Sequence, residues 1–169
     1  HYGIEMGPMS GGQILISDDP TNMKNPYPIL DGREVRAWSI EWQGKYIDYQ
    51  AKLIEASKEL EFFKAPKVLA KLISLTIQAA VDDNTKPVRL CRNTVMLVRS
   101  PIKELNEHPY VIAAMMNSLP VRYYAFMMLR AGAIQQGYSH FYAGGIGSMP
   151  TPAAVYKDDG IRSRLDSLS

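Results

Sequence analysis

The sequence predicts an α+β fold, in which a twisted mixed or antiparallel sheet has helices packed against it. Short runs of apolar and β-branched residues recur through the first hundred positions, whereas helical spacing of apolar residues dominates after Pro109. Strands and helices that are segregated along the chain favour this class over a doubly wound parallel sheet. The length of 169 residues is enough for one hydrophobic core.

The first part of the chain reads as strands joined by turns. A strand is expected at 13–17, and the proline-rich piece at 26–28 is expected to be a turn. Residues 31–35 have room for one turn of helix. Alternating apolar and polar residues at 38–42 predict a half-buried strand that forms a hairpin with 46–49.

The period of the apolar residues then changes from two to between three and four. This spacing predicts an amphipathic helix over 52–63, which Pro66 ends. Further strands are expected at 67–72, 77–81, 88–90 and 94–98, and helices at 109–117 and 119–132. The folded domain is expected to span 1–152, and the polar residues 153–169 to form a tail or a short helix.

The charge of the chain is unevenly distributed. Between Lys64 and Lys103 there are eight basic residues and two acidic ones, although the net charge of the whole chain is only +2. A polyanion such as nucleic acid would be attracted to this segment, but a solvated set of strand faces has the same composition.

Other bulk features favour a cytoplasmic protein without membrane association. The single cysteine, Cys91, cannot form an internal disulfide and is expected to be a small buried residue of a strand. The most apolar region, 109–134, is interrupted by proline and arginine, which excludes a bilayer-spanning helix there. The chain begins at His1 without a signal peptide and reads as a piece of a longer protein.

No catalytic or metal site is predicted for the chain on its own. Asn25-Pro26-Tyr27-Pro28 contains the residue types of the Asn/Asp-Pro-Pro-Tyr/Phe motif of amino-methyltransferases, but the proline and the aromatic residue are exchanged. Gly144-Gly145-Ile146-Gly147 lacks the preceding strand and following helix of a nucleotide-binding turn. The three histidines are dispersed without zinc-like spacing.

Large apolar side chains are expected to lie in the core. This expectation covers the aromatic residues Trp38, Trp42, Tyr123, Tyr124 and Phe126, for which base stacking is the alternative. It also covers a methionine cluster, which is expected to fill irregular gaps between helices: Met115, Met116, Met127 and Met128.

Several short motifs occur in an order that resembles a known family. They are Gly3-Ile4 with Gly7 before the strand Ile14-Leu15-Ile16, Pro28-Ile29-Leu30-Asp31-Gly32-Arg33-Glu34-Val35-Arg36, Phe63-Lys64-Ala65-Pro66-Lys67-Val68-Leu69, Ile77-Gln78-Ala79-Ala80-Val81-Asp82-Asp83, Ala113-Ala114-Met115-Met116-Asn117-Ser118 with Tyr123-Tyr124, and Met149-Pro150-Thr151-Pro152. In these motifs the chain resembles the TaqI-like C-terminal specificity domain, which is the target-recognition domain of adenine-N6 DNA methyltransferases and of the fused restriction-modification enzymes related to them. The resemblance covers about residues 3 to 152. The sequence departs from the family at Lys71, where arginine is usual, and at Asn93-Thr94, where Asn-Ser is usual.

The resemblance implies a DNA-methylase specificity-domain-like fold and a partner, double-stranded DNA. The methyltransferase domain would lie upstream on the same polypeptide and would bind S-adenosylmethionine, whereas no cofactor is expected in this chain. Phosphate contacts are expected from basic residues: Lys24, Arg33, Arg36, Lys67, Lys71, Arg89 and Arg92. Base contacts are expected from residues that can pair with base edges or lie in a loop after the last long helix: Asn22, Asn93, Gln135, Gln136, Tyr138 and His140.

Two alternatives remain open at the level of the sequence. One is a specificity module of a multi-subunit restriction system, which would act through a separate methyltransferase subunit. The other is a protein-interaction domain that has lost DNA binding.

Overall fold

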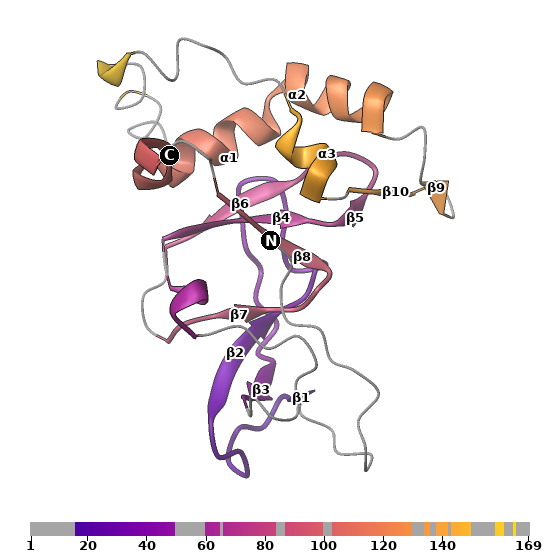
Figure 1. Cartoon of the computed structure of the whole chain (residues 1–169). Helices are drawn as coiled ribbons and strands as arrows, with labels where there is room; N and C mark the ends of the chain where they lie inside the picture. Colours follow the sequence, from indigo (N-terminus) through magenta and orange to yellow (C-terminus); the bar gives the residue numbers. More distant parts are fainter. Residues whose placement is uncertain are drawn as a thin grey trace.

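The computed structural model describes residues 16–49, 60–64, 66–83, 87–99, 103–129, 134–135, 138–141, 143–149, 158–160 and 164. Within them the predicted α+β class is confirmed. Figure 1 shows helices α1 and α2 on one side of the central strands and strands β7, β2, β3 and β1 on the other. No helix in this part of the chain is long and apolar enough to cross a membrane.

The central sheet is antiparallel and has the order β6-β4-β8. Its strands are β4 (Lys67–Lys71), β6 (Ala79–Asp82) and β8 (Val95–Val98). They lie within or close to segments where the sequence predicts strands, because each is a short β-branched or alanine-rich run bounded by turn residues. Every residue of β4 except Lys71 is buried, as expected for a strand covered on both faces.

The second sheet has the order β1-β3-β2-β7 and contains the one parallel pair among the paired strands described. It consists of β1 (Ile16–Ser17), β2 (Pro26–Leu30), β3 (Tyr46–Asp48) and β7 (Leu90–Cys91). The turn predicted at 26–28 is wrong, since both prolines lie in β2. The Ile29 N–H donates to the Lys45 carbonyl on the β3 side. Because successive N–H groups of a strand point to opposite sides, the nitrogen of Pro28 points to the β7 side. Pairing with β7 begins only at Ile29, so no hydrogen bond is lost at Pro28.

The predicted hairpin of 38–42 with 46–49 is also wrong. Strand β3 pairs with β1 and β2 instead, and an isolated bridge joins Val35 to Ile40. Residues 38–42 are a loop in spite of their alternating apolar residues. Ile40 and Trp42 pack against the core, whereas Trp38 is exposed.

The third sheet has the order β5-β10-β9 and was not predicted. Its strands are β5 (Ile73–Ser74), β9 (Ile134–Gln135) and β10 (Tyr138–His140). The loop expected around 135–140 is therefore a hairpin whose backbone pairs with β5. Each strand has two or three residues, which is too short to produce a detectable period.

Helix α1 (Pro109–Asn117) begins and ends as predicted, with Pro109 at its first position. Helix α2 (Leu119–Tyr124) continues as a π-helical segment, η4 (Ala125–Leu129). Three short elements complete the described fold: η2 (Leu60–Phe63), η3 (Lys103–Glu107) and α3 (Ala143–Gly147). Of the predicted helix at 52–63, residues 52–59 lie outside the described residues, and the last turn is the 3₁₀ turn η2.

The two faces of the central sheet belong to two hydrophobic clusters. Leu69, Ala80 and Leu97 face β2 and β7, where Ile29, Leu30 and Leu90 are buried with them. On the other face Val68, Ala70 and Ala79 contact α1 through Ile112, Ala113 and Met116. This division follows from the period of two in a strand, which sends successive side chains to opposite faces.

The prediction that the large aromatic side chains lie in the core is wrong for three of them. Trp38, Tyr123 and Phe126 are exposed, and so are Met127 and Met128 of the methionine cluster. Figure 1 shows α1 and α2 on the same side of the central sheet, and the exposed Tyr123, Phe126, Met127 and Met128 belong to α2 and η4. Met116, in contrast, is buried against the sheet as expected.

Candidate nucleic-acid interface

The amino end of β4 carries a buried ion pair. The Lys67 ammonium lies 2.8 Å from Oδ2 of Asp82, and their side chains are 3% and 0% exposed. Lys67 Nζ also donates to the Phe63 carbonyl at 2.7 Å, and Arg89 Nη1 lies 3.2 Å from Asp82 Oδ1. Lys67, which is expected from its sequence to contact a phosphate, therefore holds β4 to β6 and does not present its charge at the surface.

The carboxyl end of β4 is the place where distant segments meet. The Leu72 N–H donates to the Thr94 carbonyl at 3.1 Å, and the Leu72 carbonyl accepts from the Phe141 N–H at 2.9 Å. Strand β5 follows at once and pairs Ile73 with His140. We call this meeting point, made by residues 31–34, 71–72, 92–94 and Phe141, the Leu72 junction.

A close approach of Gly32 to Thr94 joins residues 31–34 to the rest of the junction. The Gly32 N–H donates to Thr94 Oγ1 at 3.1 Å, and a Cβ at Gly32 would lie 3.0 Å from the Thr94 carbonyl oxygen. Only glycine allows this approach of two backbone segments without a shift. Asp31 accepts from Arg92 Nη1 at 2.9 Å, which fixes the guanidinium beside the turn.

Glu34 shapes the loop that follows. Its side chain is buried, and its carboxylate accepts hydrogen bonds from the backbone N–H groups of Asp31 and Gln43, the second at 2.7 Å. A buried carboxylate that receives two backbone donors is satisfied and fixes the segments that supply them. With Glu34 turned inward, the neighbouring side chains of Arg33 and Arg36 are exposed.

The loop ends in a turn whose tip is Trp38. The Arg36 N–H donates to the Ser39 carbonyl at 3.0 Å, and Trp38 has a φ of 74°. The Trp38 N–H donates to the Ala79 carbonyl at 2.9 Å, so the turn is attached to the central sheet. The indole is 60% exposed.

The structure brings together five of the thirteen residues expected to contact DNA. Lys71 and Asn93 are partly exposed at the Leu72 junction, and Arg92 lies there beside Asp31. Arg33 and Arg36 stand on the attached loop, where Arg36 pairs with Glu41 at 2.7 Å on the surface. These side chains place positive charge at the end of the central sheet opposite the buried ion pair.

The other expected contacts are elsewhere or outside the described side chains. Asn22 and Lys24 are exposed before the first residue of β2, at the end of that strand away from the junction. Arg89 lies with Asp82 at the amino end of β4. For Gln135, Tyr138 and His140 the structure describes the backbone alone, and Gln136 lies outside the described residues.

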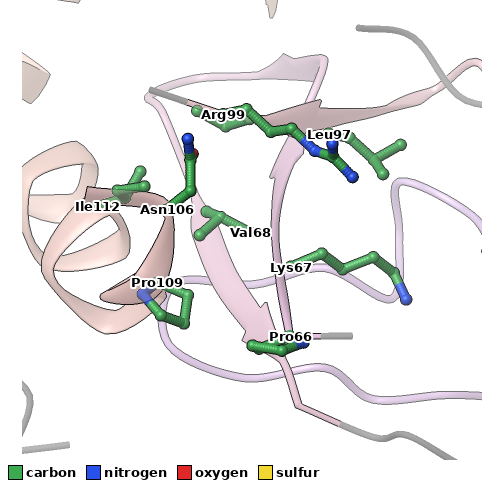
Figure 2. Close-up of a pocket in the computed structure, with 9 residues that line it drawn as sticks. Pro66, Lys67, Val68, Leu97, Arg99, Asn106, Pro109 and Ile112 are labelled. Atoms are coloured by element: carbon green, nitrogen blue, oxygen red, sulfur yellow. The ribbon is translucent and has the colours of Figure 1, made fainter. Parts of the chain in front are cut away.

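A pocket of about 200 Å³ lies between the start of α1 and strands β4 and β8 (Figure 2). Its lining combines apolar side chains with few polar ones: Pro66, Lys67, Val68, Leu97, Val98, Arg99, Asn106, Pro109 and Ile112. Figure 2 shows the Lys67 side chain extending away from α1. Its ammonium group pairs with Asp82 of β6. The Arg99 guanidinium lies over the Phe62 ring at 5.2 Å. Since both cations have structural partners, the pocket has no arrangement suited to acid-base catalysis.

Cys91 has no catalytic environment either. It is fully buried in β7, and burial raises the pKa of its thiol from 9.0 to about 12. A thiol with such a pKa stays protonated and unreactive. The sequence prediction of a small buried residue is confirmed.

Sequence reasoning did not single out Glu34, and it favoured the core over base stacking for Trp38, although both residues define the loop. Glu34 lies between exposed Arg33 and buried Val35, and a single acidic residue gives no signal of burial. Trp38 follows two arginines within a short polar stretch, which is the available signal that it lies at the surface.

Comparison with protein families gives a match over residues 27–150 to the TaqI-like C-terminal specificity domain. None of the curated proteins compared matches the chain. The matched segment contains the central sheet, the Leu72 junction, the Trp38 loop and both helices α1 and α2. It covers well over half of the chain, and the chain therefore belongs to the TaqI-like C-terminal specificity domains, the DNA-specificity domains of methyltransferase-type proteins.

Proposed function

We propose that this chain is the target-recognition domain of an adenine-N6 DNA methyltransferase or of a restriction-modification enzyme that contains one. The observation that carries the proposal is the family match over residues 27–150. The catalytic domain, with its S-adenosylmethionine site, lies upstream on the same polypeptide, and the protein acts on double-stranded DNA in the cytoplasm. The domain itself is not catalytic.

The division of labour follows from the chemistry of base methylation. The reacting nitrogen of adenine is inside the duplex, so the enzyme turns the base out of the stack and holds the remaining DNA in place. A second domain that grips the duplex opposite the catalytic domain supplies this hold and selects the sequence. Basic side chains fix the register on the phosphates, and polar side chains that reach base edges determine the sequence.

Within this function the Leu72 junction is the central contact region. Arg33, Arg36, Lys71 and Arg92 contact phosphates, and Asn93 contacts a base edge. Asn22, Lys24 and Arg89 contact DNA at the flanks. The hairpin β9-β10, adjoining the junction through β5, contributes the remaining base contacts: Gln135, Gln136, Tyr138 and His140.

The test is binding of the chain to a random-sequence duplex library at two salt concentrations, followed by sequencing of the bound molecules. A target-recognition domain enriches a short motif that contains adenine, and its affinity falls steeply with salt because cations at the interface replace counterions on DNA. Salt-sensitive binding without enrichment would mean that readout needs a further domain or subunit, as in a multi-subunit restriction system. No binding at low salt would overturn the proposal in favour of a protein-interaction domain.

A further inference from the structure

Trp38 is the non-glycine residue with a positive φ among the described residues, at 74°. A bulky side chain in this region costs on the order of 1–2 kcal/mol, and glycine is the residue that adopts it without strain. Trp38 is the third residue of a four-residue turn, 36–39, which the Arg36 N–H closes on the Ser39 carbonyl. This is a turn position at which glycine is favoured when φ is positive.

The turn is held rigidly in spite of the strain. The Val35–Ile40 bridge closes its base, and the Trp38 N–H donates to the Ala79 carbonyl. The side chain of Asn117 bonds to both the N–H and the carbonyl of Ala79, at 3.0 and 2.8 Å. The loop, the central sheet and the end of α1 are thus joined at the backbone of Ala79. The backbone that carries the Trp38 ring is therefore held in place.

Burial does not explain the tryptophan, because 60% of the residue is exposed. A glycine would fit the backbone better, so the strained position and the exposed ring are unfavourable for an isolated fold. Residues held in such conformations tend to occur at binding sites, where the surrounding structure maintains them. The ring itself is what tryptophan provides and glycine lacks.

The charges around Trp38 indicate the chemistry of its partner. Arg33 is exposed, and the pair of Arg36 with Glu41 is more than half exposed, so that a phosphate can replace the carboxylate at small cost. An exposed aromatic ring in the same loop as two exposed arginines suits nucleic acid, which offers flat bases between phosphates.

We propose that the Trp38 indole stacks on a base at a disrupted base step of the bound DNA, while Arg33 and Arg36 hold the flanking phosphates. This inference rests on the proposed function and adds a residue to it. Apolar or aromatic side chains that enter a base step unstack it and bend the duplex, so a rigid tip carrying a large ring is suited to that task. The contact favours whichever sequence is most easily unstacked, and it can therefore contribute to specificity without a hydrogen bond to a base.

The first experiment uses fluorescence, because the chain has two tryptophans. Under excitation selective for tryptophan, which avoids the ten tyrosines, Trp38 is the sole emitter in the Trp42→Phe variant, and stacking on a base quenches it. Titration with duplex DNA should quench the emission and saturate at the same concentration as the anisotropy of labelled DNA. The matched control is Trp38→Phe, in which only the partly buried Trp42 emits and DNA should change the signal little.

The second experiment compares Trp38→Gly with Trp38→Phe. Trp38→Gly removes the ring and relieves the backbone, so the thermal midpoint should be unchanged or higher while affinity for DNA falls about tenfold or more. Trp38→Phe keeps an aromatic face and should retain most of the affinity.

The outcomes separate the two proposals. Salt-sensitive DNA binding with unchanged Trp38 emission, or with unchanged affinity of Trp38→Gly, would overturn the stacking role and leave the recognition function intact. Absence of salt-sensitive binding by the unmodified chain would overturn the recognition function, and the stacking role with it.

Discussion

Lys67 and Asp82 face each other as directly paired residues of β4 and β6, and their charged groups meet 2.8 Å apart in a buried site. Arg89 approaches the other carboxylate oxygen at 3.2 Å, so one carboxylate serves two cations. Two charged side chains of the basic segment are therefore part of the scaffold.

Removal of the shared carboxylate should destabilise the fold more than removal of either cation. Asp82→Ala leaves Lys67 buried without its counter-ion, and a loss of about 3–5 kcal/mol in the free energy of unfolding is expected. Lys67→Met leaves Asp82 with Arg89 and should cost less. Urea unfolding measures both. Lys64→Ala is the control, since Lys64 pairs with Glu61 on the surface and its loss should change stability by less than about 0.5 kcal/mol. An equal cost for Asp82→Ala and Lys64→Ala would contradict the buried network.

Asn117→Ala should destabilise the contact between helix and sheet. The Asn117 side chain bonds to both the backbone N–H and the backbone carbonyl of the buried Ala79, and its loss leaves the N–H without that acceptor. A cost of about 2–3 kcal/mol is expected from thermal or urea unfolding. Ser118→Ala is the neighbouring control, because it removes only a local bond to the Met115 carbonyl. A cost no larger than that of the control would show that Asn117 does not join the helices to the sheet.

Gly32→Ala should separate the two backbone segments at the Leu72 junction. The added Cβ would meet the Thr94 carbonyl oxygen at 3.0 Å, and this backbone atom cannot move aside as a side chain can. A loss of about 1–3 kcal/mol in stability is expected, with weaker DNA binding. Gly144→Ala is the control, because its Cβ would enter open space, and it should leave both properties unchanged.

Arg33→Ala should weaken DNA binding similarly for all sequences. A lost phosphate contact lowers affinity without changing sequence preference, and it reduces the slope of log affinity against log salt by about one. Fluorescence anisotropy over a salt series measures the slope. Lys64→Ala, at the other end of β4, should leave it unchanged. A changed sequence preference for Arg33→Ala would instead indicate a base contact.

Cys91 should make stability depend on pH in alkaline solution. Burial raises the pKa of the folded-state thiol from 9.0 to about 12, so its contribution to stability is complete below pH 9. Above pH 9 the unfolded chain loses the thiol proton and the folded chain keeps it. Stability should therefore fall by about 1.4 kcal/mol per pH unit up to about pH 12. The difference in unfolding free energy between the unmodified chain and Cys91→Ala isolates this effect from other titrating groups.

Local patterns in the sequence predicted the parts of the fold that depend on local preferences. Pro109 at a helix start defines α1, and the apolar run at 67–72 contains β4. The pairing of β3 with β2 instead of with 38–42 depends on long-range contacts that leave no local period. The prolines of β2 led to a wrong prediction of a turn for the same reason. They are tolerated in a strand because β7 pairs with β2 only at Ile29 and Leu30, and this pairing is not visible in the local sequence.

The candidate site was predictable in composition and less so in arrangement. Basic residues could be listed from the sequence, but the structure buries Lys67 and leaves Lys71 partly exposed. The register of β4 with β6 places Lys67 opposite Asp82, and this pairing allows the ammonium group to be buried. Trp38 illustrates the opposite error. Tryptophan is usually placed in a core because of its size, whereas the exposure of Trp38 in the structure shows that this ring points outward.

The parallel pairing of β2 with β7 also has a kinetic consequence. Leu30 and Cys91 lie side by side, with the loop, η2 and two strands of the central sheet between them in the chain. A parallel pair closes only after its long crossover is formed, and contacts so distant along the chain slow folding. During synthesis, β2 remains without this neighbour until the ribosome has released Cys91. The synthesis of residues 31–91 is therefore expected to be the interval in which nascent chains associate through the open edge of β2.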